Sequence, residues 1–266
     1  MEITGILHTH STYSYDAKLS LTELRDLFVS RGLSFACMTE HVDEMTEASA
    51  DAFVKECRAL SDSTFTFVPG FEVPYKRAHI LMIGCERFFG NYAATVEALQ
   101  PWVGSTSFVV LAHPVRNRFV VEDALLSSLD AIEVWNQQYE GKRVPRTRSL
   151  SLLRHLREKD PLLLSTGGVD FHRTEHLGGP FVTLEVGELA PEAILEKLKT
   201  GAYRVHSPQT SFYGTAPNVD ELIRAHRFES AFSVAIIVLG KTVNTVLAAF
   251  GISLPKSLKR LIRRKL

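Results

Sequence analysis

Short apolar runs alternate with amphipathic stretches from about residue 3 to residue 205. Runs of this length predict strands, expected at 3–7, 35–38, 64–68, 80–83, 108–111, 131–135, 162–165, 182–186 and 203–205. The amphipathic stretches predict helices, expected at about 20–32, 46–60, 92–102, 145–159 and 191–201. Ser20 and Glu23 have the spacing of a capping box, which marks the start of the first helix. The alternation predicts an α/β fold, and the number of strands suits a distorted TIM-like barrel of parallel strands.

The pattern changes after residue 207, where a loop rich in Ser, Thr, Pro and Tyr precedes an apolar helix expected at about 231–252. We therefore expect a barrel domain of residues 1–207 and a helical C-terminal extension of residues 208–266. Lys241 lies in the middle of the apolar stretch, where a lysine costs roughly 3 kcal/mol in a bilayer, which argues against a membrane span.

The tail of about 254–266 is basic and has no acidic residue; its charges are Lys256, Lys259, Arg260, Arg263, Arg264 and Lys265. Four apolar residues would form the other side of a helix there. Two interpretations stay open: a surface helix that packs on the barrel or on a second subunit, and a peripheral contact with anionic lipid or a phosphate polymer.

Composition narrows the class of protein. The 266 residues include 30 basic and 30 acidic side chains, so no net charge draws the whole chain toward nucleic acid or membrane. A hydrophobic content of 45% is enough for a large core. Cys37, Cys57 and Cys85 are odd in number and widely spaced, which predicts reduced thiols in a cytoplasmic protein and argues against a thiolate zinc site. The N-terminus lacks the pattern of a secretion signal.

Potential metal ligands follow the apolar runs within the first 172 residues; they are His8, His10, Asp16, His41, Glu72, His79, His113, Asp170 and His172. In a barrel, the carboxyl ends of the strands meet at one rim, so these side chains would converge. His8 and His10 are two residues apart, and on an extended strand both would project to the same side, as would Asp170 and His172. Imidazoles and carboxylates without thiolate suit Zn, Mn or Fe.

The charge of such a site indicates its substrate. The nine ligands could hold two or three divalent ions and leave positions open for water and substrate. Three ions, three carboxylates and one hydroxide would sum to about +2, which matches a phosphate dianion. We therefore expect a phosphoesterase in which a metal-bridging hydroxide attacks a phosphomonoester or a small nucleotide phosphodiester.

Basic residues follow several strand ends, where arginine's planar fork suits phosphate. Arg116 and Arg173 are the strongest candidates for binding the substrate, and His176 could contact it or make a hydrogen bond within its loop. The segment from His172 to His176 also matches His-x-x-Glu-His, but the flanking glycine pairs leave too little room for the helix that this zinc motif needs. Glu133 could order a ligand histidine or pair with an interior arginine.

Five motifs in order resemble the PHP (polymerase and histidinol phosphatase) family over roughly residues 5–175; they are Leu7-His-Thr-His-Ser, Thr39-Glu-His, Gly70-Phe-Glu, His113-Pro and Gly168-Val-Asp-Phe-His. The resemblance implies a distorted (β/α)7 barrel with a di- or trinuclear centre of Zn, Mn or Fe. It also implies three ligand groups, which are His8, His10, Glu72 and Asp170; Glu72, His79 and His113; and Asp16, His41 and His172. Glu40 replaces the more common aspartate, as a longer partner of the ligands or as a simple substitution. The assignment of His79 rests on a short, loosely defined motif, Ala78-His-Ile.

Two other functions stay open at this stage. One is an exonuclease acting on DNA or RNA ends, since PHP domains accompany DNA polymerases. The other is a non-catalytic metal-binding module recruited by its basic tail, against which the complete ligand set argues. Assembly into a homo-oligomer is compatible with either.

Overall fold

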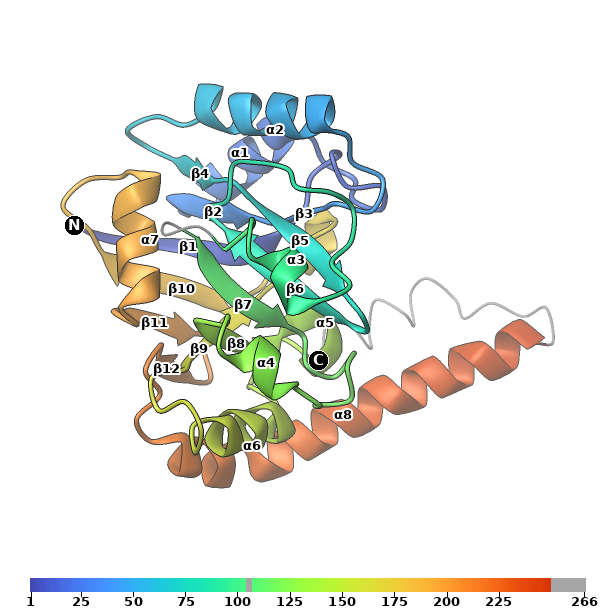
Figure 1. Cartoon of the computed structure of the whole chain (residues 1–266). Helices are drawn as coiled ribbons and strands as arrows, with labels where there is room; N and C mark the ends of the chain where they lie inside the picture. The colour runs from blue at the N-terminus through green and yellow to red at the C-terminus, as the bar shows by residue number, and fades with distance from the viewer. Residues whose placement is uncertain (104–106, 250–266) are drawn as a thin grey trace.

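The structure, a computed structural model, describes residues 1–103 and 107–249 and has an α/β fold with mixed sheets (Figure 1). The strands of the first sheet are β1 (Glu2–Thr9), β2 (Phe35–Met38), β4 (Thr66–Val68), β10 (Phe181–Glu185), β11 (Tyr203–His206) and β12 (Ser211–Tyr213). Their order across the sheet is β12-β11-β10-β1-β2-β4. The strands of the second sheet are β3 (Glu40–His41), β5 (Gly70–Tyr75), β6 (Ala78–Ile83), β7 (Phe108–Ala112), β8 (Ala131–Asn136) and β9 (Leu164–Gly168), in the order β3-β5-β6-β7-β8-β9.

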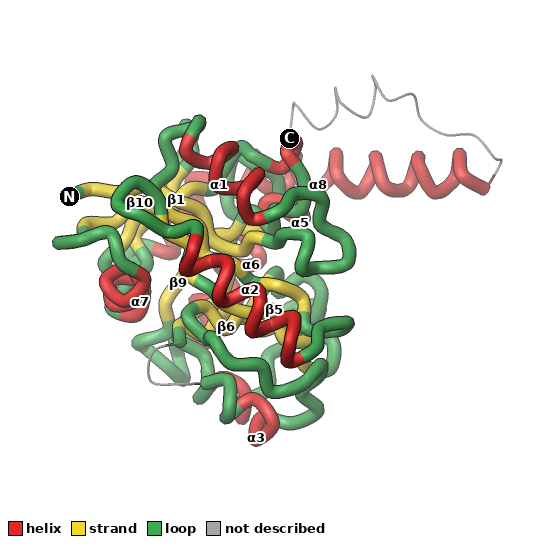
Figure 2. Tube along the Cα trace, turned by 90° about the horizontal axis from the view of Figure 1, so that it is seen from above, coloured by secondary structure: helices red, strands yellow, loops and turns green. Residues whose placement is uncertain are grey.

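Helices cover the sheets on several sides; they are α1 (Leu21–Val29), α2 (Glu47–Ala59), α3 (Val96–Leu99), α4 (Asp123–Leu126), α5 (Gln137–Glu140), α6 (Thr147–Leu156), α7 (Pro191–Lys199) and α8 (Val219–Ala249). Figure 1 shows α2 above the sheets and α6 below them, and Figure 2 shows α2 lying across β5 and β6. The expected capping box forms at the start of α1, where the Glu23 carboxylate accepts a hydrogen bond from the backbone N–H of Ser20 (2.8 Å).

The expectation of parallel strands throughout is wrong. β7, β8 and β9 pair in parallel, but β5, β6 and β7 pair antiparallel. The cause is the connection between β5 and β6: Tyr75 pairs with Ala78, so only two residues form the turn, and a parallel crossover needs a much longer segment. The sequence pattern does not reveal β5. It places Glu72 after the strand expected at 64–68, whereas Glu72 lies within a strand of its own.

The two sheets meet where the candidate ligands gather. After β9, Val169 N donates to Leu7 O (3.0 Å) and Phe171 N donates to His8 O (3.0 Å), so the chain leaving the second sheet lies against β1 of the first. The strands form two sheets in this arrangement, and closure into a TIM-like barrel stays a prediction.

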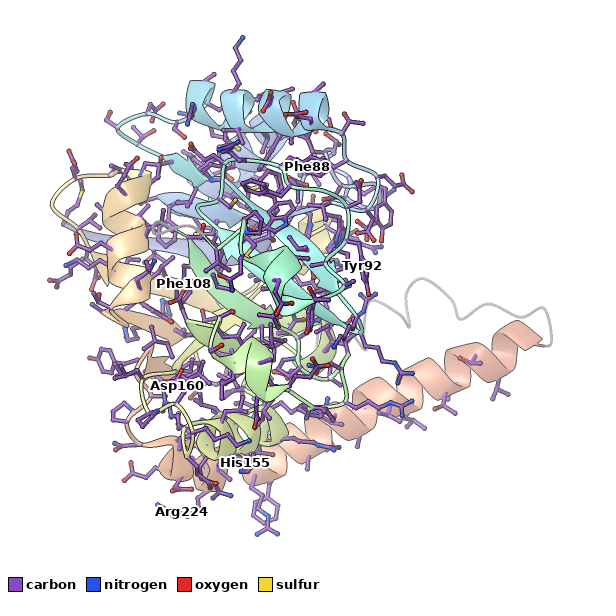
Figure 3. All side chains as sticks on the ribbon, viewed as in Figure 1. Phe88, Tyr92, Phe108, His155, Asp160 and Arg224 are labelled. Carbon is purple, nitrogen blue, oxygen red and sulfur yellow. The ribbon has the colours of Figure 1, made fainter. Side chains whose placement is uncertain are left out.

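Aromatic side chains fill the core between the strands and helices. Phe71 lies within β5 and contacts Trp102 (ring centroids 5.5 Å apart) and Phe53 (5.8 Å), and all three are buried. Figure 3 shows Phe108 among the strands, whereas Arg224 and His155 lie at the edge of the molecule. Complete burial of each such ring contributes roughly 1.5–3 kcal/mol to stability.

The C-terminal extension contains one long helix. α8 begins at Val219, earlier than the expected residue 231, and Ser230 Oγ accepts a hydrogen bond from Thr147 N (3.1 Å), which holds α8 against α6. The last expected positions of this helix and the tail of about 254–266 lie outside the described residues, and the domain boundary at residue 207 stays a prediction. The expected helix at 92–102 is reduced to α3. Among the described residues, no helix has the length and apolar character needed to cross a membrane.

Candidate metal centre

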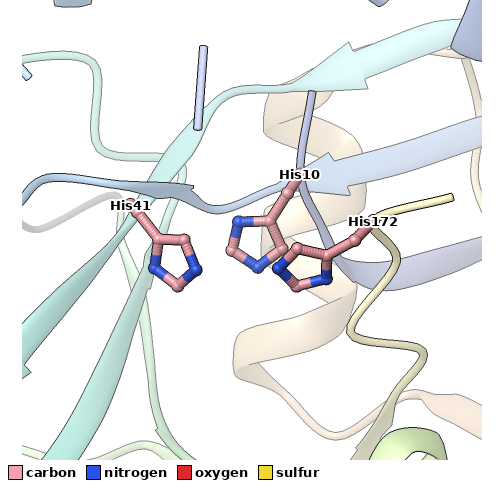
Figure 4. Close-up of side chains that lie close together, drawn as sticks. All are labelled: His10, His41 and His172. Atoms are coloured by element: carbon pink, nitrogen blue, oxygen red, sulfur yellow. The ribbon is translucent and has the colours of Figure 1, made fainter. Parts of the chain in front are cut away.

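All nine candidate ligands lie in one cluster, on strands of both sheets or in the segments that follow them. β1 provides His8, β3 provides His41, β5 provides Glu72 and β6 provides His79, and the segments after β1, β7 and β9 provide the others. Figure 4 shows the convergence of His10, His41 and His172, whose segments are far apart in the sequence. The ring of His10 lies 4.4 Å from that of His41 and 4.3 Å from that of His172.

Some of the donor atoms have the spacing of a metal site. His8 Nε2 lies 3.4 Å from Glu72 Oε2 and 3.5 Å from Asp170 Oδ1, and His10 Nε2 lies 3.4 Å and 3.7 Å from the same two oxygens. Ligands about 2.1 Å from a tetrahedral ion are about 3.4 Å from one another. His8, His10 and Glu72 form one group whose donor atoms lie close enough together to hold a divalent ion, and Asp170 lies in a second such group with His8 and His113.

Glu72 connects the first of the three expected ligand groups to the other two. Its second oxygen, Oε1, contacts His79 Nδ1 and lies 3.0 Å from His113 Nε2. In the third group, Asp16 Oδ2 lies 3.2 Å from His172 Nε2 and Asp16 Oδ1 lies 3.7 Å from His41 Nε2. The ring of His41 also turns its Nδ1 toward Glu72 Oε2 (3.2 Å), so the carboxylate of Glu72 is the point where all three groups meet.

Several of these polar atoms are buried without a hydrogen-bond partner among the described residues. They include His10 Nε2, Asp16 Oδ1 and His41 Nδ1. A buried polar atom left in this state costs about 1–3 kcal/mol. Divalent ions held by these atoms would remove that cost, so the arrangement fits a metal centre.

The pKa shifts of His10, His41 and Glu72 suit metal ligands. Burial, together with the neighbouring imidazoles of His41 and His172, lowers the pKa of His10 well below its usual range, and burial also lowers the pKa of His41. Burial alone would raise the pKa of Glu72, but His8 and His79 hold it well below the usual range. Neutral imidazoles beside an ionised carboxylate are the forms that bind metal. Burial would also lower the pKa of His8, but the carboxylates of Asp170, Glu133 and Glu72 raise it well above the usual range, so an ion bound there would displace a proton.

The backbone is strained at three candidate ligands. His8 (φ 62), His113 (φ 27) and Asp170 (φ 53) adopt left-handed conformations, which cost of order 1–3 kcal/mol each in residues other than glycine. The expectation that His8 and Asp170 lie in extended backbone is therefore wrong. Both still reach the cluster because the backbone turns there, and such strain is concentrated at functional sites.

Glu133 supports two of the ligands from within β8. It is buried, its Oε1 lies 3.0 Å from His8 Nδ1, and its Oε2 accepts a hydrogen bond from His113 N (2.7 Å). Of its two expected roles, the structure shows contact with a histidine, the candidate ligand His8. The position of Glu133 also explains why residue 168 is a glycine, since a Cβ there would lie 1.9 Å from Glu133 Oε1.

Glu40 acts on the ligands through a serine. Its carboxylate accepts hydrogen bonds from Ser11 Oγ (2.6 Å) and Ser14 Oγ (2.5 Å). Ser14 Oγ in turn accepts a hydrogen bond from His41 N (2.9 Å) and lies 3.2 Å from His10 Nδ1. The longer side chain of Glu40 therefore fits the role of a supporting partner.

His176 holds the loop that carries His172. Its Nδ1 accepts a hydrogen bond from His172 N (3.1 Å), and burial with the nearby charge of Arg173 lowers its pKa to about 4. Residues Thr174–His176 form a single 3-10 turn, so the zinc motif that requires an α-helix does not form here. The contacts of His176 are those of a loop residue.

The basic residues around the site separate into two sets. Arg143 pairs with Glu229 (2.9 Å), and Lys142 Nζ donates to Glu175 O (3.0 Å). Arg146 and Arg148 lie over the ring of Phe119, at 5.1 Å and 4.5 Å from its centroid. By contrast, the exposed side chains of Arg116 and Arg173 have no carboxylate partner within the described part of the chain.

Two tyrosines beside the ligands were missed in the sequence, because they belong to no motif. Tyr15 stacks on His41 (ring centroids 5.3 Å apart), and Tyr139 lies 5.1 Å from the ring of His113. Burial raises the pKa of both tyrosines, and the charge of Arg116 opposes the rise in each. The available signals were the position of Tyr15 directly before Asp16 and that of Tyr139 in α5, the short helix that follows β8.

Known proteins share this architecture. A crystal structure of a two-domain protein from Bacteroides vulgatus, containing a predicted PHP-like metal-dependent phosphoesterase, is similar (TM-score 0.58, 16% identity) over 78% of this chain and 65% of that one. Endonuclease Q in complex with a 27-mer duplex containing an abasic lesion is similar (TM-score 0.51, 16% identity) over 76% of this chain and 57% of that one. This chain thus spans less than two thirds of either protein.

No curated protein sequence matches the chain. The family model of the PHP domain matches residues 7–175, the segment that carries all nine candidate ligands. This chain belongs to the PHP domain family.

Proposed function

We propose that this protein is a metal-dependent phosphoesterase that hydrolyses a phosphomonoester or a small nucleotide phosphodiester. The observation that carries the proposal is the spacing of 3.4–3.7 Å among His8, His10, Glu72 and Asp170 in a PHP domain. These four would hold one ion. A second would be held by Glu72, His79 and His113, and a third by Asp16, His41 and His172, with Zn, Mn or Fe as the metals that suit this donor set.

Divalent ions bound there would neutralise the negative charge of the phosphate and acidify a water molecule. The chain's own contribution is to bind and orient the substrate. Arg116 closes the turn that begins at the candidate ligand His113, since Arg116 N donates to His113 O (2.9 Å), and its side chain is exposed. Arg116 and Arg173 would bind oxygens of the phosphate, and the exposed ring of Tyr15 would border the leaving group.

A phosphate-release screen on metal-replete protein tests the proposal. The panel comprises sugar phosphates, amino-alcohol phosphates and nucleotides. We expect turnover of at least one of them and its loss in the double variant His8→Ala/His10→Ala, with circular dichroism as a control for folding. Retained turnover in the folded double variant would refute the proposed site.

Nucleic-acid ends are the second candidate substrate, because the fold is similar to that of endonuclease Q in complex with duplex DNA. Comparing the hydrolysis of mononucleotides with that of oligonucleotides separates the two. Faster cleavage of oligonucleotides would favour a nuclease.

The proposed location is the cytoplasm. Cys37, Cys57 and Cys85 are all unpaired and buried, as expected for a protein kept in a reducing compartment.

A further inference from the structure

α8 consists of a packed part and a projecting part. Its first turns lie against the rest of the protein, where Glu229 pairs with Arg143 (2.9 Å) and Ser230 accepts a hydrogen bond from Thr147. Beyond Ser230 the helix runs past α6 and projects from the molecule, as Figures 1 and 2 both show. In Figure 3, the side chains drawn at its far end have no other described element beside them.

From Phe228 onward, α8 exposes large apolar side chains along one side. Phe228 is 85% exposed, Phe232 65% and Leu239 63%, and Val243 and Val246 are exposed as well. At 100° per residue these five positions fall on one side of the helix. We name them the α8 apolar stripe. An exposed apolar surface of this kind marks an interaction site.

Charges are scarce along this part of the helix. From residue 230 to residue 249 the only charged residue is Lys241. The following segment, residues 250–266, reverses the pattern with six basic residues and no acidic one. An apolar helix followed by a basic segment is the combination that binds anionic lipid, because apolar side chains enter the acyl boundary while basic side chains meet the headgroups.

A second copy of the chain is a poorer occupant of the stripe. The stripe spans residues 228–246, which is shorter than the three to four heptads that a coiled coil usually needs. A parallel pair would also bring two basic segments together, and their repulsion would oppose pairing. We infer that the α8 apolar stripe and the basic segment after it dock this protein on an anionic lipid surface.

Vesicle co-sedimentation of the full chain tests the inference, independently of any phosphoesterase activity. The vesicles are phosphatidylcholine alone and phosphatidylcholine mixed with phosphatidylglycerol. The stripe variant is Phe232→Glu/Leu239→Glu. Its matched control, Ala48→Glu/Ala52→Glu, adds the same two charges to exposed positions of α2. A tail variant replaces all six basic residues of the tail with glutamine.

We expect the wild type and the control to bind the anionic vesicles at least about tenfold more strongly than the neutral ones, since each basic residue near an anionic surface raises binding several-fold. Both the stripe variant and the tail variant should lose at least about tenfold in binding to the anionic vesicles. Equal binding by the stripe variant and the control would overturn the inference. The inference would also be overturned if the wild type bound no vesicles and formed a dimer without lipid in sedimentation equilibrium, while the stripe variant was a monomer.

Discussion

Replacing Glu133 with glutamine tests how the protein prepares His8 for metal. Both oxygens of Glu133 are occupied: Oε1 faces His8 Nδ1 at 3.0 Å, and Oε2 accepts hydrogen bonds from His113 N (2.7 Å) and Asn136 Nδ2 (2.9 Å). With a proton on Nδ1 shared with Glu133, the lone pair of His8 Nε2 is directed at Glu72 and Asp170, where the ion would lie.

Glutamine has the same shape but only one acceptor oxygen. If its amide NH2 group faces His113 N and Asn136 Nδ2, it meets two other hydrogen-bond donors and neither of them has an acceptor. If it faces His8, the Nδ1 atom must accept, which moves the ring proton to Nε2 and blocks the ligand atom. Loss of such a supporting partner lowers metal affinity about 10–100-fold, or about 1.4–2.7 kcal/mol.

Competition with a chromophoric chelator measures this change in affinity. Glu140→Gln is the matched control, because Glu140 is another buried carboxylate of the same region that contacts Ser149 and Asn136 N rather than a ligand. Gly168→Ala should weaken binding similarly by displacing the Glu133 carboxylate. Affinity of Glu133→Gln within about threefold of the control would refute the reasoning.

Two further predictions concern stability and substrate binding. Burial raises the pKa of Glu140 from 4.5 to about 8, so folding takes up a proton between these values and the free energy of unfolding falls as pH rises through that window. In urea unfolding of metal-free protein, the free energy of unfolding of Glu140→Gln should increase relative to that of the wild type between pH 5 and pH 8, by up to about 5 kcal/mol. A constant difference between the two proteins over this range would contradict the prediction. Arg116→Ala should raise KM about tenfold or more while Arg118→Ala, a nearby exposed arginine, changes it little; equal effects in phosphate-release kinetics would exclude a specific role for Arg116.

The candidate site was more predictable from sequence than the sheet around it. The nine candidate ligands could be recognised because almost all of them follow a short apolar run, and the structure gathers all nine into one cluster. Hydrophobic alternation also predicted β2 at its observed bounds. What alternation cannot show is strand direction, since it records only which side chains are buried.

The hairpin of β5 and β6 illustrates that limit. Its two-residue turn contains Lys76 in a left-handed conformation (φ 52), where glycine or asparagine would have signalled a hairpin. The left-handed backbone at His8 (φ 62) was equally hidden, because no glycine marks that position in the sequence. Tyr139 approaches His113 only through folding, and Tyr15 directly precedes Asp16 but belongs to no motif that would mark it.

The metal content of purified protein tests the central claim most directly. Protein equilibrated with Zn, Mn or Fe and freed of excess metal should retain two or three ions per chain by elemental analysis, and fewer in His8→Ala/His10→Ala. Phosphate release should disappear on chelation and return when the metal is restored. Less than one ion per chain in the wild type, or full phosphate release from metal-free protein, would contradict the account.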